Sequence, residues 1–412
     1  MFKVFFILLS ALNLYLGLSI INDPKQSLSI LRVIVFGYGP IILSILFIFV
    51  LFKKKITIVL FNTIILLALV VFSYEIFFIF FQNKEIKKIN SKIILSEPIK
   101  NKKPPQICPA NLWTERDLDL YPVGGISNTE ITKQNSITKN ETIRKSDKYG
   151  FNNKTEVWNF KNTFAIFIGD SFAYGADVTH DEGYVELFKK KFPNTINLGC
   201  GGNGPISELA SFVEYAKILK PRYVIWNYYE NDLTKNLTKE LLSPYKKYLD
   251  KNFNQDLLNK QTKIDEVLTN FWNNNKNNTI KKNLKLNSYS QFYKLYNLRT
   301  NIGLTHGYSN EVFEIFKGIL FRVKNETESW GGKLIFVYIP TSSKYKNFIS
   351  YLDENYYYKN IEEFLKSEKI NLINLDKELK KYGDQENFFH GHFNKKGNEL
   401  VATILYEKLL GQ

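Results

Sequence analysis

The chain has 412 residues and a formal net charge of +15, with 55 lysines and arginines against 40 acidic residues. The lysines are scattered among asparagine, isoleucine and phenylalanine and do not gather into one recognition motif, so nucleic acid is not an expected partner. The charge instead suits a surface beside an anionic membrane or an acidic polysaccharide.

Three apolar runs occupy residues 1–82. They cover residues 2–21, 33–52 and 56–74, and each is close to the ~20 residues that cross a hydrocarbon core. The first run lacks a small-residue cleavage site and two further runs follow it, so it is interpreted as an anchor and not as a signal peptide. The sequence therefore predicts three transmembrane helices in an N-terminal membrane anchor.

The orientation of this anchor follows from its lysines. Lys53, Lys54 and Lys55 form the densest basic cluster in a short loop, which the positive-inside rule places in the cytoplasm. The third helix then runs outward, and the C-terminal region lies outside the cytoplasm. Lysines just beyond the third run favour the opposite orientation.

Two segments separate the anchor from the main domain. Residues 83–110 contain a stretch rich in proline and lysine and predict an extended linker. Residues 111–160 alternate turn residues with aromatic ones and predict a β-rich extension. We expect this extension to pack along the following domain, either beside its functional site or as a purely structural lead-in. About 300 residues remain beyond the anchor, enough for one domain with a buried core.

The apolar run 164–168 ends in Gly169-Asp170-Ser171 and a turn of small residues. This pattern predicts a strand that delivers Ser171 to the start of a helix, where the helix N-terminus can stabilise negative charge. Ser171 is therefore a candidate nucleophile. The tripeptide is weak evidence by itself, because a helix-capping serine at an ordinary turn gives the same pattern.

Three later segments add groups that acyl transfer requires. A glycine-dense loop, 199–204, follows a short strand and offers backbone N–H donors. The strand at 223–229 ends in Glu230-Asn231-Asp232, where the Asn231 amide can face a developing negative charge and Asp232 is expected to bond nearby backbone. His392 stands just before the last helix as a candidate general base.

Five short apolar runs set the expected fold, and they alternate with helical stretches. They lie at residues 163–168, 195–198, 222–228, 333–339 and 371–375. This alternation predicts an α/β domain with a parallel sheet covered on both faces and with the four motif segments at the strands' carboxyl ends. Residues 250–310 interrupt this alternation of strands and helices and predict a helical insertion. The insertion either caps the site or projects into solvent.

The order Gly-Asp-Ser, Gly, Asn-Asp and His-Phe-Asn-x-x-Gly over residues 161–412 resembles the SGNH/GDSL hydrolase superfamily, in particular its membrane-anchored bacterial members. The resemblance implies a three-layer fold with a parallel five-stranded sheet and a catalytic domain that uses no cofactor or metal. It also implies that Ser171 is the nucleophile and His392 the general base. The oxyanion hole would combine the N–H groups of Ser171 and Gly202 with the Asn231 amide.

One departure from the family pattern concerns the acid that orients the histidine. The family usually has aspartate three residues before the histidine, where this chain has Phe389. Asp384 or Glu386 can approach from the preceding loop, or a backbone carbonyl can take the role, or activity is weak or lost. His390 is interpreted as an exposed loop residue and not as a metal ligand.

The expected function is a serine ester hydrolase that cleaves acyl esters of envelope carbohydrate or lipid. The expected acyl group is acetyl. The alternatives are an O-acyltransferase that modifies cell-envelope polysaccharide with a membrane partner supplying acyl groups, and an inactive membrane-tethered protein that binds glycan or a partner. The expected location is the bacterial inner membrane, with the catalytic domain outside the cytoplasm. That compartment permits a disulfide between Cys108 and Cys200, the two cysteines, but the sequence leaves their pairing open.

Overall fold

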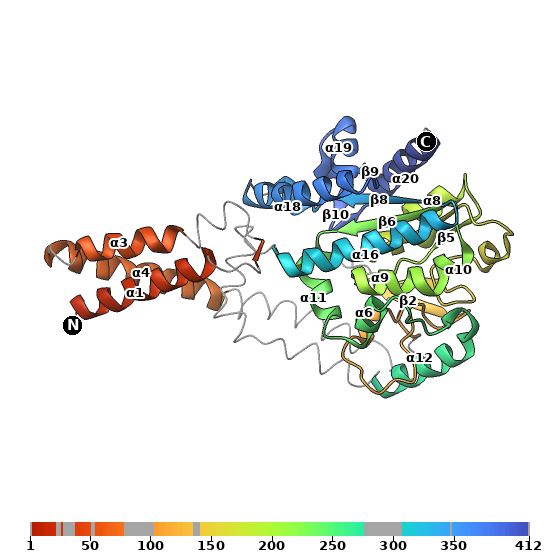
Figure 1. The fold of residues 1–412 in the computed structure, drawn as a ribbon, viewed down its shortest axis with the longest axis horizontal. Coiled ribbons are helices and arrows are strands. Elements are labelled where there is room, and N and C mark those ends of the chain that lie inside the picture. Colours follow the sequence, from red (N-terminus) through yellow and green to blue (C-terminus); the bar gives the residue numbers. More distant parts are fainter. Residues whose placement is uncertain are drawn as a thin grey trace. The chain divides into compact units, whose positions relative to one another are not determined.

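The computed structural model describes residues 2–21, 26–27, 38–50, 54–77, 103–134, 141–275, 307–346 and 348–410. The chain divides into two compact units (Figure 1). The first unit comprises Met1–Lys100, Ile280–Glu311 and Asn347–Tyr357, and the second comprises Asn101–Thr279, Val312–Lys346 and Tyr358–Gln412.

The first unit contains three N-terminal helices: α1 (Phe2–Ile21), α3 (Gly39–Val50) and α4 (Lys54–Phe77). A polar contact joins α1 to α3, because Ser10 Oγ lies 2.8 Å from Ser44 Oγ. The rings of Phe6 and Phe47 pack edge to face beside it, with centroids 5.4 Å apart. The same unit holds a short antiparallel pair formed by β1 (Gln26–Ser27) and β7 (Tyr308–Ser309).

The prediction of three transmembrane helices has no support from the described residues. Among them, no helix combines the length and the apolar character that crossing a membrane demands. Helix α3, for example, has 12 residues where about 20 are needed. Residues 33–37 and 51–52 of the predicted second span, and residues 83–102 of the predicted linker, lie outside the described residues.

The second unit is built on a parallel five-stranded sheet with the order β5-β4-β6-β8-β9. Its strands are β4 (Ala165–Ile168), β5 (Thr195–Asn197), β6 (Tyr223–Tyr229), β8 (Lys333–Ile339) and β9 (Asn371–Asn374). Each matches one of the five apolar runs, so the predicted α/β fold with a parallel five-stranded sheet is confirmed. Strands β5 and β6 flank β4, which brings the segments that follow these three strands to one edge of the sheet.

Helices cover both faces of this sheet, which is why β4 is buried along its whole length. One face packs against α8 (Tyr184–Lys189) and α20 (Lys395–Leu410) through an apolar cluster that includes Phe167 and Val337. On the other face, Phe316 of α16 (Asn310–Ser329) meets the ring of Phe336 at 6.3 Å. Figure 1 shows the strands between these helical layers.

The segment that precedes β4 forms a small substructure, which we call the lead-in segment (residues 103–160). It contains α6 (Pro109–Leu112) and an antiparallel pair of strands, β2 (Glu130–Gln134) and β3 (Glu141–Lys145). A disulfide joins its Cys108 to Cys200, 92 residues further along the chain. The pairing that the sequence left open is therefore made.

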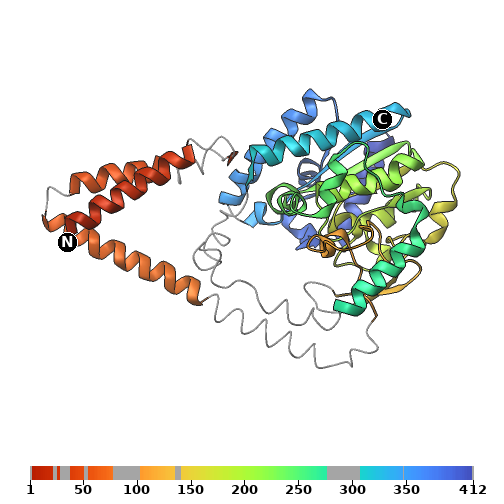
Figure 2. The same cartoon turned by 60° about the horizontal axis from the view of Figure 1, so that its bottom comes forward.

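The predicted helical insertion is described only in part. Helix α12 (Gln261–Asn275) lies within its first half, and residues 276–306 lie outside the described residues. Asp265 of α12 accepts hydrogen bonds from the N–H and the hydroxyl of Ser127, at 2.8 and 2.6 Å. Both views accordingly place α12 beside the lead-in segment (Figure 1 and Figure 2).

The remaining α-helices and strands complete the connections. They are α7 (Ser171–Tyr174), α9 (Pro205–Ser211), α10 (Lys217–Leu219), α11 (Leu237–Glu240), α17 (Ser343–Lys346), α18 (Phe348–Ser367), α19 (Leu375–Leu379), β10 (Phe389–His390) and β11 (His392–Phe393).

Candidate active site

Ser171 is the first residue of α7, directly beyond the carboxyl end of β4. The side chain of Asp170 accepts a hydrogen bond from the Phe172 N–H at 2.9 Å and so caps the helix start. Gly169 allows the close approach of β6, since a Cβ there would lie 2.9 Å from the Cβ of Asn227. Burial raises the pKa of the Asp170 carboxyl. The predicted strand-to-helix delivery of the serine is therefore present.

His392 lies against this serine although the two are 221 residues apart in the chain. Its Nε2 is 2.9 Å from Ser171 Oγ. A tight hairpin of β10 and β11 carries it, turning at Gly391 with φ +80°. The imidazole packs edge to face on Phe172, with ring centroids 5.0 Å apart. His390, paired with His392 across the hairpin, is exposed as predicted.

The acid that faces His392 is Asp177, a residue that the sequence reasoning missed. Its Oδ2 lies 2.6 Å from His392 Nδ1, and its side chain is only 6% exposed. Neither predicted acid takes this place: Asp384 and Glu386 are both exposed, and Glu386 pairs with Lys346 at 3.2 Å. The prediction of Asp384 or Glu386 as the orienting acid is therefore wrong.

The reason lies in the backbone just after the nucleophile. Gly175 ends α7 with φ +77°, and Asp177 itself has φ +64°, a left-handed conformation that aspartate tolerates better than most residues. These two left-handed residues reverse the chain within six residues of Ser171, so one short segment supplies both the nucleophile and the acid. The sequence signal was the Gly175-Ala176-Asp177 turn, where small residues leave room for such a reversal.

The side chains of Ser171, His392 and Asp177 form one continuous hydrogen-bonded chain. When His392 donates its Nδ1–H to Asp177, Nε2 is left as the acceptor for the serine proton. The carboxylate also stabilises the imidazolium that forms when the proton moves. This arrangement is suited to acyl transfer by a serine nucleophile.

The glycine loop after β5 is held by a buried carboxylate. Glu240 accepts hydrogen bonds from the N–H groups of Gly204, Ile206 and Ser207, at 3.1, 2.9 and 2.9 Å. Burial raises the pKa of Glu240, although these donors favour its ionised form. Gly202 in the same loop has φ +81°, and a Cβ there would lie 3.1 Å from the Cβ of Ala110 in the lead-in segment. Both features favour glycine at this position.

Asn231 follows β6, on the other side of β4 from the glycine loop. Its Oδ1 accepts a hydrogen bond from Asn236 Nδ2 at 3.3 Å, and the same Nδ2 donates to the Asn203 carbonyl at 2.9 Å. Because Oδ1 faces Asn236, the Asn231 NH₂ group points away from that contact. Asn236, which the sequence reasoning missed, thus ties the two loops together.

Asp232 takes the structural role predicted for it. Its Oδ2 accepts a hydrogen bond from the Tyr229 N–H at 3.0 Å, which fixes the end of β6. Burial, with Asp170 nearby, raises the pKa of this carboxyl well above its ordinary value.

No family model matches the sequence, and a search of curated proteins gives no match. Among solved structures, the chain is similar to a lipase/acylhydrolase from Enterococcus faecalis, with 15% identity, a TM-score of 0.35, and 60% of this chain and 96% of that chain covered. It is also similar to the acetyl xylan esterase AlAXEase, with 14% identity, a TM-score of 0.34, and 60% and 98% covered.

A third similar structure is a member of the lipolytic G-D-S-L family from Veillonella parvula, with 14% identity, a TM-score of 0.34, and 60% of this chain and 97% of that chain covered. Structural neighbours of the chain therefore include proteins of the GDSL family, at low sequence identity, which is the family that the four motifs resemble.

Proposed function

We propose that this protein is a serine esterase that cleaves acyl esters through an acyl-enzyme on Ser171. The observation that carries the proposal is the continuous chain from Ser171 Oγ through His392 to Asp177, with contacts of 2.9 and 2.6 Å. A serine hydroxyl is a weak nucleophile unless a base takes its proton and an acid orients that base. All three groups stand at hydrogen-bond distance without any rearrangement.

The reaction would proceed in two steps. Ser171 Oγ attacks the ester carbonyl while His392 Nε2 takes the hydroxyl proton, and the Ser171 N–H, the Gly202 N–H and the Asn231 amide stabilise the oxyanion. The ester C–O bond then breaks, and the departing alcohol receives the proton from His392. Water, deprotonated by His392, then attacks the acyl carbonyl. The bond between the acyl carbon and Ser171 Oγ breaks, His392 returns the proton to Oγ, and the carboxylic acid leaves.

We further propose that the substrates are acyl esters, acetyl esters above all, of envelope carbohydrate or lipid. The chain's net charge of +15 supports an acidic polymer or an anionic membrane surface as the setting. Attack by a sugar hydroxyl in place of water would make the same residues an O-acyltransferase, so product analysis with glycan acceptors separates transfer from hydrolysis.

The test is fluorophosphonate labelling of the detergent-solubilised full chain, together with hydrolysis of p-nitrophenyl acetate. We expect the parent protein to be labelled, the Ser171→Ala variant to lose the label, and the His392→Ala variant to react far more slowly. His390→Ala is the matched control, because His390 lies in the same hairpin but is exposed. A well-folded parent protein that is not labelled would contradict the esterase proposal. It would favour the alternative of an inactive protein that binds glycan or a partner.

We also propose that residues 1–82 anchor the protein in the bacterial cytoplasmic membrane with the catalytic domain outside. Large apolar side chains exposed on all three N-terminal helices support this, including Leu8, Leu46 and Val59. The Cys108–Cys200 disulfide suits an oxidising compartment. Alkaline extraction of membranes and protease digestion of intact spheroplasts test it: release by alkali, or protection of the domain in spheroplasts, would contradict the proposal.

A further inference from the structure

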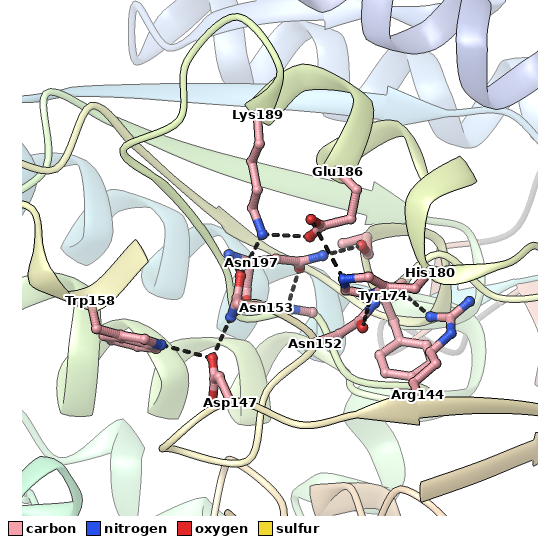
Figure 3. A network of polar contacts seen from close by, with 12 residues as sticks. Arg144, Asp147, Asn152, Asn153, Trp158, Tyr174, His180, Glu186, Lys189 and Asn197 are labelled. Carbon is pink, nitrogen blue, oxygen red and sulfur yellow. Dashed lines mark hydrogen bonds and ion pairs between the residues drawn. The ribbon is translucent and has the colours of Figure 1, made fainter. Parts of the chain in front are cut away.

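The catalytic acid stands on a turn that a distant side chain holds in place. Arg144 of β3, in the lead-in segment, is buried at 3% exposure. Its guanidinium donates to the carbonyl oxygens of Tyr174 at 3.2 Å and Gly175 at 2.8 Å, and also to that of Val178. Figure 3 shows Arg144 beside the ring of Tyr174, whose centroid is 5.1 Å from the guanidinium carbon.

The three carbonyls bracket Asp177 in the chain. Two of them precede it and one follows it, so a single planar group spans the turn on which the acid stands. Arginine is suited to this task, because its donors are fixed in one plane while a lysine ammonium is a single point of charge. The left-handed backbone of Asp177, at φ +64°, is a conformation that the surroundings must impose.

A second residue of the lead-in segment supports the same turn. Asn152 Nδ2 donates to the Tyr174 carbonyl at 2.8 Å, and Asn152 Oδ1 lies 2.8 Å from His180 Nδ1. His180 Nε2 is in turn 3.9 Å from Glu186 of α8. Burial lowers the pKa of His180, which favours the neutral ring in this network (Figure 3). The turn that carries Asp177 is thus held at its start and just beyond its end.

We propose that Arg144 is a positioning residue for Asp177, and that the lead-in segment is consequently part of the catalytic unit; the proposal rests on the esterase function proposed above. Without the guanidinium, the buried carbonyls of Gly175 and Val178 lose this donor, while the Tyr174 carbonyl keeps the one from Asn152. The turn then loses the contacts that bracket Asp177. The 2.6 Å contact between Asp177 and His392 Nδ1 depends on that turn. A displacement of about 1 Å at such a group can cost on the order of 100-fold in rate.

The test is a double-mutant cycle on the full chain in detergent, with p-nitrophenyl acetate as the substrate. We expect Arg144→Met to lower kcat by about 10- to 100-fold with KM nearly unchanged. If Arg144 acts through Asp177, adding Arg144→Met to Asp177→Asn should cost no more than about a further twofold. Losses that multiply in the double variant, or an unchanged kcat in Arg144→Met, would overturn the proposal.

Arg322 provides a matched control within the same unit. It is also buried, at 6% exposure, and donates to the carbonyls of Tyr248, Asp250 and Lys251 at 2.7, 3.3 and 3.2 Å. Arg322→Met removes a buried guanidinium that likewise donates to three backbone carbonyls. It should therefore lower the melting temperature while kcat stays close to that of the parent. An equal loss of kcat in Arg322→Met would show that Arg144 contributes only general stability.

Arg144→Lys covers the case in which Arg144→Met fails to fold, because it keeps the buried charge. Its lysine cannot span three carbonyls, so kcat should still fall. A spectroscopic signature separates this proposal from the esterase itself: the downfield NMR signal of the His392 Nδ1 proton, assigned by its loss in His392→Gln. Arg144→Lys should weaken that signal even if the parent hydrolyses nothing, and an unchanged signal would contradict the positioning role.

Discussion

The substitution Asp177→Asn tests the most specific feature of the site, the acid that orients His392. Asparagine preserves the size of the side chain but places an amide opposite Nδ1, 2.6 Å away in the parent. An NH₂ group in that place donates to Nδ1 and moves the ring proton to Nε2, so the histidine can no longer accept the proton of Ser171. At 6% exposure, the position leaves little room for water to replace the carboxylate.

The expected loss is large because the wrong tautomer removes the base altogether. A comparable substitution in a serine–histidine–aspartate triad costs about 10⁴-fold in kcat, or about 5.4 kcal/mol of transition-state stabilisation. The measurement is kcat for p-nitrophenyl acetate hydrolysis, with the melting temperature as the check on folding. Fluorophosphonate labelling of Ser171 should slow in parallel.

Two controls make the prediction specific. Asp384→Asn and Glu386→Gln remove the two acids that most closely precede His392 in the sequence, and both residues are exposed. We expect each to retain kcat within about twofold of the parent, as surface substitutions usually do. If Asp177→Asn kept more than a tenth of the activity, or if either control fell as far, the assignment of Asp177 would be refuted.

Three further predictions concern Asn231, the disulfide and a buried glutamate of α9. Asn231→Ala should lower kcat by about 10²- to 10³-fold by removing one oxyanion donor, measured as ester hydrolysis; a loss below about fivefold would remove Asn231 from the oxyanion hole. The double variant Cys108→Ala, Cys200→Ala should lose about 2–5 kcal/mol of unfolding free energy, because the bond closes a loop with a sequence separation of 92; unchanged urea unfolding would contradict this. Burial and the nearby Asp232 raise the pKa of Glu208 well above 4.5. The contribution of this protonated carboxyl to the stability of the folded state is therefore complete below about pH 4.5, and it is lost as the pH rises toward the folded-state pKa. The unfolding free energy of the parent minus that of Glu208→Gln should therefore fall with rising pH, by at most about 1.4 kcal/mol per unit, and a flat or rising difference would contradict it.

Much of the scaffold could be predicted because its signals are local. Each strand of the sheet is a short apolar run, and strands buried on both faces must consist of such runs. Ser171 and Asn231 stand where two of these runs end, and His392 stands where the last helix begins, so polar residues at element ends marked the site. The structural role of Asp232 followed from the tendency of aspartate to bond nearby backbone, and the Tyr229 N–H confirms it.

The acid and the disulfide depended on contacts between distant segments. Proximity in sequence to His392 favoured Asp384 and Glu386, but the β10–β11 hairpin leaves both exposed. Asp177 reaches the histidine because its backbone is held in a left-handed turn, bracketed by the bonds of Arg144.

The sequence by itself predicted the strands and the candidate nucleophile and base, since apolar periodicity and turn chemistry depend on neighbouring residues. Only the tertiary structure decided which acid lies against His392 and whether the two cysteines pair. Those choices depend on where the lead-in segment packs: Arg144 stands 33 positions before Asp177, and Cys108 stands 92 before Cys200. No local pattern encodes contacts across such separations, because they form only when the whole unit has folded.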